Sequence, residues 1–318
     1  MIFVLKESNQ QNAMTVNILI VLLTMVSMGS SPGGKPASEA SSDREIHRDF
    51  DDILELGIEA FYQADWDEAQ AVFEELRNRD ASDLRPWFFE AMVPFWKYFF
   101  AGQDSEMARE FLDWSGKAVE VGDRRLSNVP GDTTAILMMG GLHGYRGLVA
   151  ASEREFRTAM RSGAAGYSFT RKLMQMSSEN PDALIGQGVY HYMVGTIPDG
   201  ARWLTNMAGL RGDKLTGFSK LEEAAGRNSH TRTDARMILT YLYHQEEKYE
   251  DALRVSSLLV DDWPENEIFR YYYAISLEKT GRNDEAADQF RIVEASEHAD
   301  LEKLREESRE RRDSLISE

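Results

Sequence analysis

The feature that most restricts the fold is a spaced pattern of small and large apolar residues in the C-terminal third. Ala252 and Ala286 each follow an acidic residue, and they lie 34 positions apart. Phe290 follows Ala286 by four positions, on the same side of a helix. A small residue lets two paired helices approach closely, and a large apolar residue one turn later fills the space between neighbouring pairs. The spacing therefore predicts stacked helix pairs, each of which needs its neighbours.

The same arrangement recurs near the N-terminal end. Leu56-Gly57 stands where a first helix would pack, Trp66 opens the second helix, and Ala69 precedes Phe73 by four positions. Further positions that fit the pattern are Ala108, Gly217, Leu221, Ala224, Pro264 and Gly281. We therefore predict an all-α fold, an α-solenoid of about six to seven antiparallel helix pairs forming a right-handed superhelix like that of tetratricopeptide repeats (TPR). The charged segment from residue 300 onward suits a capping helix with a polar outer face.

The N-terminal segment has the character of an export signal. Residues 16–26 are apolar over the length of a signal-peptide core, and small residues follow at once. We expect a signal peptide or N-terminal anchor at 1–29, a flexible linker at 30–42 and the repeat domain at 43–318. The basic region is weak, since Lys6 is its only cation and translation could start at Met14. Export to the periplasm or envelope is the prediction, and a cytoplasmic protein is the alternative.

Glycines interrupt the repeat between residues 133 and 217. Gly140 and Gly144 lie on one side of a helix, so they would permit close approach by another helix backbone. The stretches 140–147, 180–192 and 209–217, with a Gly-x-Gly-x-Tyr-x-Tyr run beginning at Gly186, resemble a group of TPR proteins. That group includes exported Bacteroidetes-type proteins of unassigned activity and the fungal inclusion-body-clearance proteins. The resemblance covers residues 130–295, and it implies no catalytic motif.

The irregular middle also gathers the polar and aromatic side chains that could bind a ligand or partner. Irregular loops on a rigid helical scaffold often carry function. Asp213 is expected to cap a helix that runs through Gly217, and the Arg211-Gly212-Asp213 tripeptide is read as part of that turn. The candidate binding residues are Tyr190, His191, Tyr192, Arg202, Trp203, Arg211 and Asp213.

Residues 87–100 are dense in aromatic side chains around Pro94, which is expected to kink or break the helix. Such rings usually form core between stacked pairs. The sharper hypothesis is that Trp96 lines a concave groove and grips an apolar segment of a partner.

Composition excludes several kinds of chemistry. The chain has 54 Asp and Glu against 36 Lys and Arg, a formal net charge of -18, and no cysteine. Nucleic-acid partners are therefore not expected, and neither are disulfides or thiolate metal sites. The six histidines form no metal-binding motif, so neither a metal nor another cofactor is expected.

These observations favour a binding protein over an enzyme. We predict a scaffold or adaptor for a protein or peptide partner outside the cytoplasm, with membrane association only through an uncleaved N-terminal segment. The alternative is a ligand-binding or enzymatic protein that uses a pocket in residues 190–214.

Overall fold

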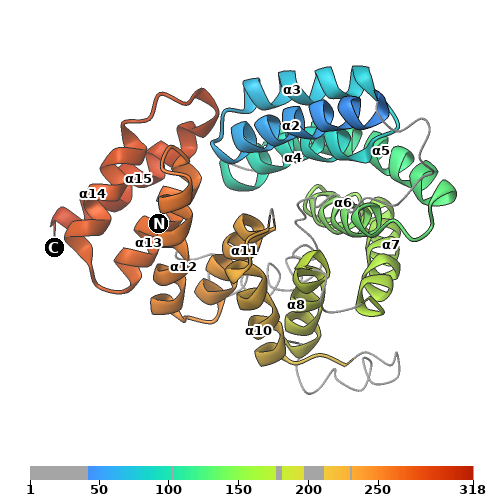
Figure 1. Cartoon of the computed structure of the whole chain (residues 1–318). Coiled ribbons are helices and arrows are strands. Elements are labelled where there is room, and N and C mark those ends of the chain that lie inside the picture. Colours follow the sequence, from blue (N-terminus) through green and yellow to red (C-terminus); the bar gives the residue numbers. More distant parts are fainter. Residues whose placement is uncertain (1–41, 102–103, 177–180, 197–210, 230, 318) are drawn as a thin grey trace. The chain divides into compact units, whose positions relative to one another are not determined.

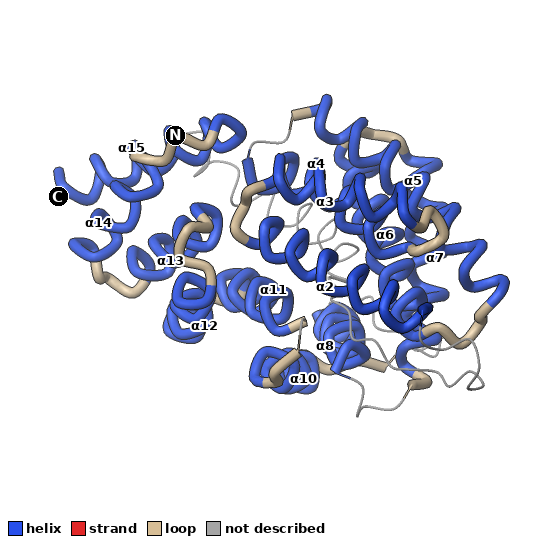
Figure 2. Tube along the Cα trace, turned by 45° about the horizontal axis from the view of Figure 1, so that its top comes forward, coloured by secondary structure: helices blue, strands red, loops and turns tan. Residues whose placement is uncertain are grey.

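The chain is almost entirely helical. The computed structural model describes residues 42–101, 104–176, 181–196, 211–229 and 231–317. Over these residues it consists of α-helices and one short 3-10 helix, joined by loops and without strands (Figures 1 and 2). Adjacent helices pack in pairs, which confirms the predicted all-α, TPR-like helical solenoid. None of the described helices combines the length and hydropathy that crossing a bilayer requires.

Two compact units divide the chain. Unit 1 contains the described residues between 126 and 239, in a region whose larger part was predicted to be irregular, and unit 2 contains those between 42 and 125 and between 240 and 317. The helices of unit 1 are α6 (Thr133–Ser152), α7 (Phe156–Met174), α8 (Pro181–Thr196), α10 (Lys214–Gly226) and α11 (Arg232–Gln245), the last of which runs on into unit 2. The helices of unit 2 are α2 (Ser42–Tyr62), α3 (Trp66–Arg79), α4 (Leu84–Ala101), α5 (Ser105–Asn128), α12 (Tyr249–Asp262), α13 (Glu267–Lys279), α14 (Asn283–Glu294), η2 (Ala299–Leu301) and α15 (Glu302–Ser317).

The first helix pair of unit 2 forms largely as the spacing predicts. Helix α3 begins at Trp66, and the Asp65 side chain caps it by accepting a hydrogen bond from the Glu68 amide at 3.4 Å. Gly57 lies against α3, since a Cβ there would come within 2.7 Å of the Phe73 ring. The expectation that Leu56 also packs is wrong, because its side chain is 59% exposed. Neighbouring helix positions point about 100° apart, so Gly57 and Leu56 cannot both face α3.

The C-terminal pairs follow the predicted repeat closely. Ala252, Ala286 and Phe290 are fully buried. Gly281 adopts φ 77° in the turn between α13 and α14, a conformation that favours glycine. Helix α12 ends two residues before Pro264, and α15 packs on α14 with Leu304 buried. The charged C-terminal segment is thus the capping helix that was expected.

Unit 2 also joins segments that are far apart in the sequence. The Trp96 ring of α4 meets the Phe269 ring of α13 edge-on, with centroids 5.9 Å apart. Lys97 Nζ lies 2.8 Å from the Asp300 carboxylate, and His298 Nε2 lies 2.6 Å from the Ala64 carbonyl oxygen. A stack in which each pair contacts only its sequence neighbours would contain none of these contacts.

The aromatic segment belongs to the core of unit 2. Helix α4 continues through Pro94 to Ala101, so Pro94 does not end the helix. Trp96 is 1% exposed, and its ring contacts Phe61 and Tyr62 as well as α13. Burial of these side chains offsets the single helix hydrogen bond that Pro94 cannot make. The position of Trp96 agrees with the core interpretation, since the ring presents no surface to a partner.

Glycines bring the helices of unit 1 together at backbone distance. A Cβ on Gly166 of α7 would lie 3.5 Å from the Gly144 nitrogen and 3.7 Å from the Gly140 carbonyl oxygen of α6. The predicted close approach at Gly140 and Gly144 is therefore confirmed. The irregular middle is itself built of paired helices, whose backbones approach closest at the glycines.

Candidate functional site

The predicted site residues fall into three groups. Tyr190, His191 and Tyr192 lie on α8, and Arg211 and Asp213 lie directly before α10, which packs against α8. Arg202 and Trp203 lie outside the described residues. Trp96 lies in the core of unit 2. The structure therefore brings five of the eight candidates onto one helix pair.

This helix pair is held in backbone contact by glycines on both members. A Cβ on Gly217 of α10 would lie 2.6 Å from the Tyr192 nitrogen and 2.8 Å from the Gly188 carbonyl oxygen of α8. A Cβ on Gly195 would lie 2.5 Å from the Lys214 nitrogen. Any larger residue would push the helices apart. The Gly-x-Gly-x-Tyr-x-Tyr run therefore serves to fix the position of the aromatic side chains.

Asp213 is the helix cap that its position predicts. Its carboxylate accepts hydrogen bonds from the Thr216 amide and the Thr216 hydroxyl, both at 2.8 Å. The Gly217 amide donates to the Asp213 carbonyl oxygen at 2.9 Å, which begins the helix. These hydrogen bonds to the charged form lower the pKa of Asp213. The residue thus orients α10, and the Arg211-Gly212-Asp213 tripeptide belongs to a helix start, as predicted.

Tyr192 is a packing residue. It is buried, and its ring meets the Phe218 ring of α10 edge-on with centroids 5.5 Å apart. Of the Tyr-His-Tyr run, only Tyr190 and His191 can therefore contact a partner. Both are half-buried, and their ring centroids lie 5.7 Å apart.

Two residues that the sequence did not single out complete the site. Gln187 is buried, and its amide nitrogen donates to the Leu173 carbonyl oxygen at the end of α7 at 3.3 Å. Its amide oxygen accepts a hydrogen bond from Lys220 Nζ at 2.8 Å, so it connects α7, α8 and α10. The two residues lie 33 positions apart, close to one repeat, which is the only signal of their contact in the sequence.

The same lysine affects His191. Burial lowers the pKa of His191, the Lys220 ammonium lowers it further, and Asp213 opposes the shift. The imidazole is therefore neutral at pH 7, and its Nδ1 atom is buried without a hydrogen-bond partner. An uncharged imidazole beside an ammonium group can accept or donate one hydrogen bond to a partner group.

Tyr190 links this site to α7. Burial raises the pKa of Tyr190, a hydrogen bond with the Arg211 backbone lowers it, and the nearby Tyr167 of α7 raises it. We call the surface formed by Tyr167, Tyr190, His191 and Lys220 the α8 face. It combines two aromatic rings, a neutral imidazole and one ammonium group on a helix pair fixed by glycines. Among the described residues, no group of three or more His, Asp or Glu side chains could hold a metal ion.

Comparison with known families identifies the C-terminal part. Residues 237–299 match the family model described as tetratricopeptide repeat. This segment of the chain is similar to tetratricopeptide repeats. It runs from the middle of α11 to η2 and contains both Ala252 and Ala286, so the repeat predicted from their spacing is confirmed. No curated protein matches the chain. The finer resemblance of residues 130–295 to exported bacterial and fungal TPR proteins stays a prediction.

Proposed function

We propose that this chain is a scaffold that binds a protein or peptide partner outside the cytoplasm and has no catalytic activity of its own. The observation that carries the proposal is the TPR region at 237–299, because TPR repeats are generally protein-interaction scaffolds. The same helical architecture extends over the other described residues.

The α8 face is the surface we propose for the partner. Aromatic rings such as Tyr190 provide apolar contact at a low cost in conformational entropy, and they are enriched at protein interfaces. Lys220 and His191 add polar groups for a carboxylate or a peptide carbonyl oxygen. Because α8 and α10 are in backbone contact at Gly188 and Gly217, these groups are held in place before a partner arrives.

Co-purification of the chain from its native cells tests the proposal. The wild type should carry a stoichiometric protein partner, and Tyr190→Ala with Lys220→Gln should lose it at a temperature at which circular dichroism shows that the variant is still folded. A matched variant in the repeat region, Tyr273→Ala with Lys279→Gln, should retain it. Loss in the matched variant alone would move the binding surface to the repeats, and absence of any protein partner at several salt concentrations would overturn the proposal.

A second candidate is favoured by one observation, the buried and unpartnered Nδ1 atom of His191 near Lys220. These groups suit a small anionic ligand, as a binding protein or enzyme using residues 190–214 would require. Native mass spectrometry of the same preparation separates the two candidates, because a bound small molecule adds a discrete mass below that of any protein.

Export rests on the N-terminal segment and has its own test. A reporter that is active only outside the cytoplasm, fused after residue 42, should be active, and N-terminal sequencing of the mature chain should show whether cleavage occurs near residue 29. An inactive reporter would favour the cytoplasmic alternative.

A further inference from the structure

Helix α7 exposes large apolar side chains along one flank, about 100° around the helix from its packing face. Phe156 is 64% exposed, Met160 is 78% exposed and Tyr167 is 37% exposed. They are separated by four and seven positions, which places them in one row along the helix. The packing face of α7, with Gly166, Thr170 and Leu173, is buried. A row of exposed apolar side chains indicates an interaction surface.

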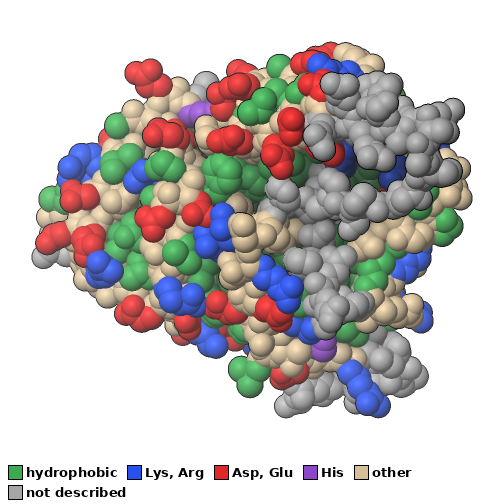
Figure 3. All heavy atoms as spheres, in the orientation of Figure 1, with side chains coloured by type: hydrophobic (Ala, Val, Ile, Leu, Met, Phe, Trp, Pro, Cys, Tyr) green, Lys and Arg blue, Asp and Glu red, His purple; other side chains and the backbone are tan. Residues whose placement is uncertain are grey.

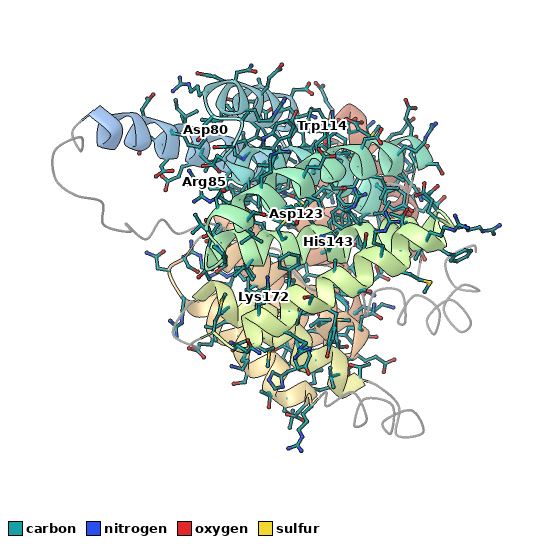
Figure 4. All side chains as sticks on the ribbon, turned by 90° about the vertical axis from the view of Figure 1, so that its right-hand side faces the viewer. Asp80, Arg85, Trp114, Asp123, His143 and Lys172 are labelled. Carbon is teal, nitrogen blue, oxygen red and sulfur yellow. The ribbon has the colours of Figure 1, made fainter. Side chains whose placement is uncertain are left out.

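The same helix carries cations and no carboxylate. Arg157, Arg161, Arg171 and Lys172 lie on α7, and the segment Phe156–Met174 contains neither Asp nor Glu. These four side chains make no ion pair in the described part of the chain. This is unusual in a protein of net charge -18, and the face in Figure 3 shows acidic and basic side chains intermixed. Figure 4 views unit 1 from the side of α7, with Lys172 labelled. The surface therefore suits an acidic partner with an apolar centre.

Helix α2 of unit 2 presents an acidic surface with an apolar centre. Between Asp49 and Gln63 it contains no cation. Asp52, Glu55 and Glu59 are exposed at spacings of three and four, and the exposed Leu56 lies among them. The sequence pattern predicted that Leu56 would pack against a neighbouring helix, but its side chain is exposed to solvent. The outer sides of α2 and α7 are thus complementary in charge, and each has an apolar centre.

We propose that the outer side of α7 in one copy of this chain docks against the outer side of α2 in a second copy. Phe156 and Met160 pack on Leu56, and Arg157 and Arg161 face the carboxylates of α2. Because the two surfaces differ, a pair of copies keeps one free α2 and one free α7, and association proceeds head to tail. The contact weakens as salt screens the charges.

Sedimentation velocity of the full chain tests this contact. The wild type should show a larger species that grows with protein concentration and is lost at high salt. Reversal of the α7 charges (Arg157→Glu with Arg161→Glu) should give a monomer, and so should reversal of the α2 charges (Asp52→Lys with Glu59→Lys). An equimolar mixture of the two variants should associate again, because the unchanged α7 of one can meet the unchanged α2 of the other and the two reversed surfaces can pair as well.

The control is an equal charge reversal of two exposed cations on α5, Arg109→Glu with Arg124→Glu, which should still associate. A monomer at every concentration would overturn the proposal, as would association that survives in either reversed variant alone. Binding of the chain to phosphatidylglycerol-containing vesicles through α7, without self-association, would also overturn the proposal. It would show that the α7 surface binds lipid instead. The charge reversals leave every residue of the α8 face unchanged, although Tyr167 belongs to both surfaces. The partner-binding proposal is therefore tested separately, by co-purification.

Discussion

The Asn266 side-chain amide donates a hydrogen bond to the backbone carbonyl oxygen of Tyr62 at 2.6 Å, although 204 positions separate the two residues. Asn266 is fully buried, and its amide oxygen accepts a hydrogen bond from the Phe269 amide at 2.9 Å. One side chain therefore caps α13 and also fixes the end of α2. The Tyr62 and Trp263 rings, 5.4 Å apart, close the same junction within unit 2.

Asn266→Ala should lower the free energy of unfolding more than an ordinary cap substitution. Loss of the cap costs about 1 kcal/mol. The Tyr62 carbonyl oxygen loses its side-chain donor, which costs about 1–3 kcal/mol more if the group stays buried. Denaturant unfolding measures the change. Asn283→Ala, at the exposed start of α14, is the matched control and should change stability by less than about 0.5 kcal/mol. Equal effects in the two variants would contradict the role of Asn266.

Gly217→Ala and Gly163→Ala should have opposite effects, although both replace a helical glycine in unit 1. At Gly217 the new methyl group would lie 2.6 Å from a backbone nitrogen of α8, so the helices must separate at a cost of about 1–3 kcal/mol. At Gly163 no atom lies within 4 Å, and alanine should stabilise α7 by about 0.5–1 kcal/mol. Thermal melting distinguishes them. A neutral Gly217→Ala would argue against the backbone contact of α8 and α10, and a destabilising Gly163→Ala would argue against the open space around that glycine.

Trp96→Ala should destabilise unit 2 by about 3–5 kcal/mol, because the ring is buried against α2 and α13. If Trp96 instead gripped a partner, binding would fall while the melting temperature stayed constant. Leu56→Ala removes an exposed apolar side chain of the same unit and should leave stability within about 0.5 kcal/mol.

Glu90 of α4 is buried in an ion pair with Arg77 of α3. The Arg77 guanidinium lies between two indole rings, 4.8 Å from the centroid of Trp87 and 4.9 Å from that of Trp114. Burial raises the pKa of Glu90 to about 7 from an ordinary 4.5, although Arg77 lowers it. The folded state thus binds a proton on Glu90 more tightly than the unfolded state does.

The contribution of Glu90 to stability should therefore be complete below about pH 4.5 and should be lost as the pH rises to about 7. The full difference is on the order of 3 kcal/mol. Glu90→Gln cannot ionise and keeps an oxygen that accepts from Arg77, so this part of the pH dependence should disappear. Denaturant unfolding at a series of pH values measures it. A variant with the same slope as the wild type would contradict the raised pKa.

His244 should make stability depend on pH in the opposite direction to Glu90. Burial, with Lys279 and Arg311 nearby, lowers the pKa of His244 to about 4 from an ordinary 6.5, and its Nε2 lies 2.8 Å from the Ser276 hydroxyl. The neutral imidazole stabilises the fold above pH 6.5, and this contribution is lost as the pH falls towards 4. His244→Gln keeps a polar group for Ser276 and should flatten that acid limb by about 3 kcal/mol at most. An unchanged acid limb would show that the histidine charges in the folded state without penalty.

The periodic parts of the fold could be predicted from local spacing. Ala69 and Ala286 are each followed by a phenylalanine one turn later, and Ala252 lies one repeat of 34 positions before Ala286. All three mark places where paired helices touch, because a small residue there lets the helices approach closely. The same logic correctly placed the cap at Asp213 and the turn at Gly281. It failed at Leu56, whose neighbour Gly57 takes the packing position.

The site was predictable in part. The sequence pointed to Tyr190 and His191, but it gave no reason to choose Gln187 or Lys220, because a lysine and a glutamine are common on any exposed helix. Their contact depends on how α8 and α10 are spaced, which the glycines at positions 188, 195 and 217 set by removing side chains from the helix boundary.

Spacing along the chain was enough to define helix pairs, since helix formation and the contact between neighbouring helices depend on residues one or two turns apart. It could not show that α2 and α4 pack against α13, or that Asn266 reaches Tyr62. Such contacts join residues of unit 2 that are far apart in the sequence, and no spacing within one or two turns records them. They were visible only once all helices of unit 2 were placed.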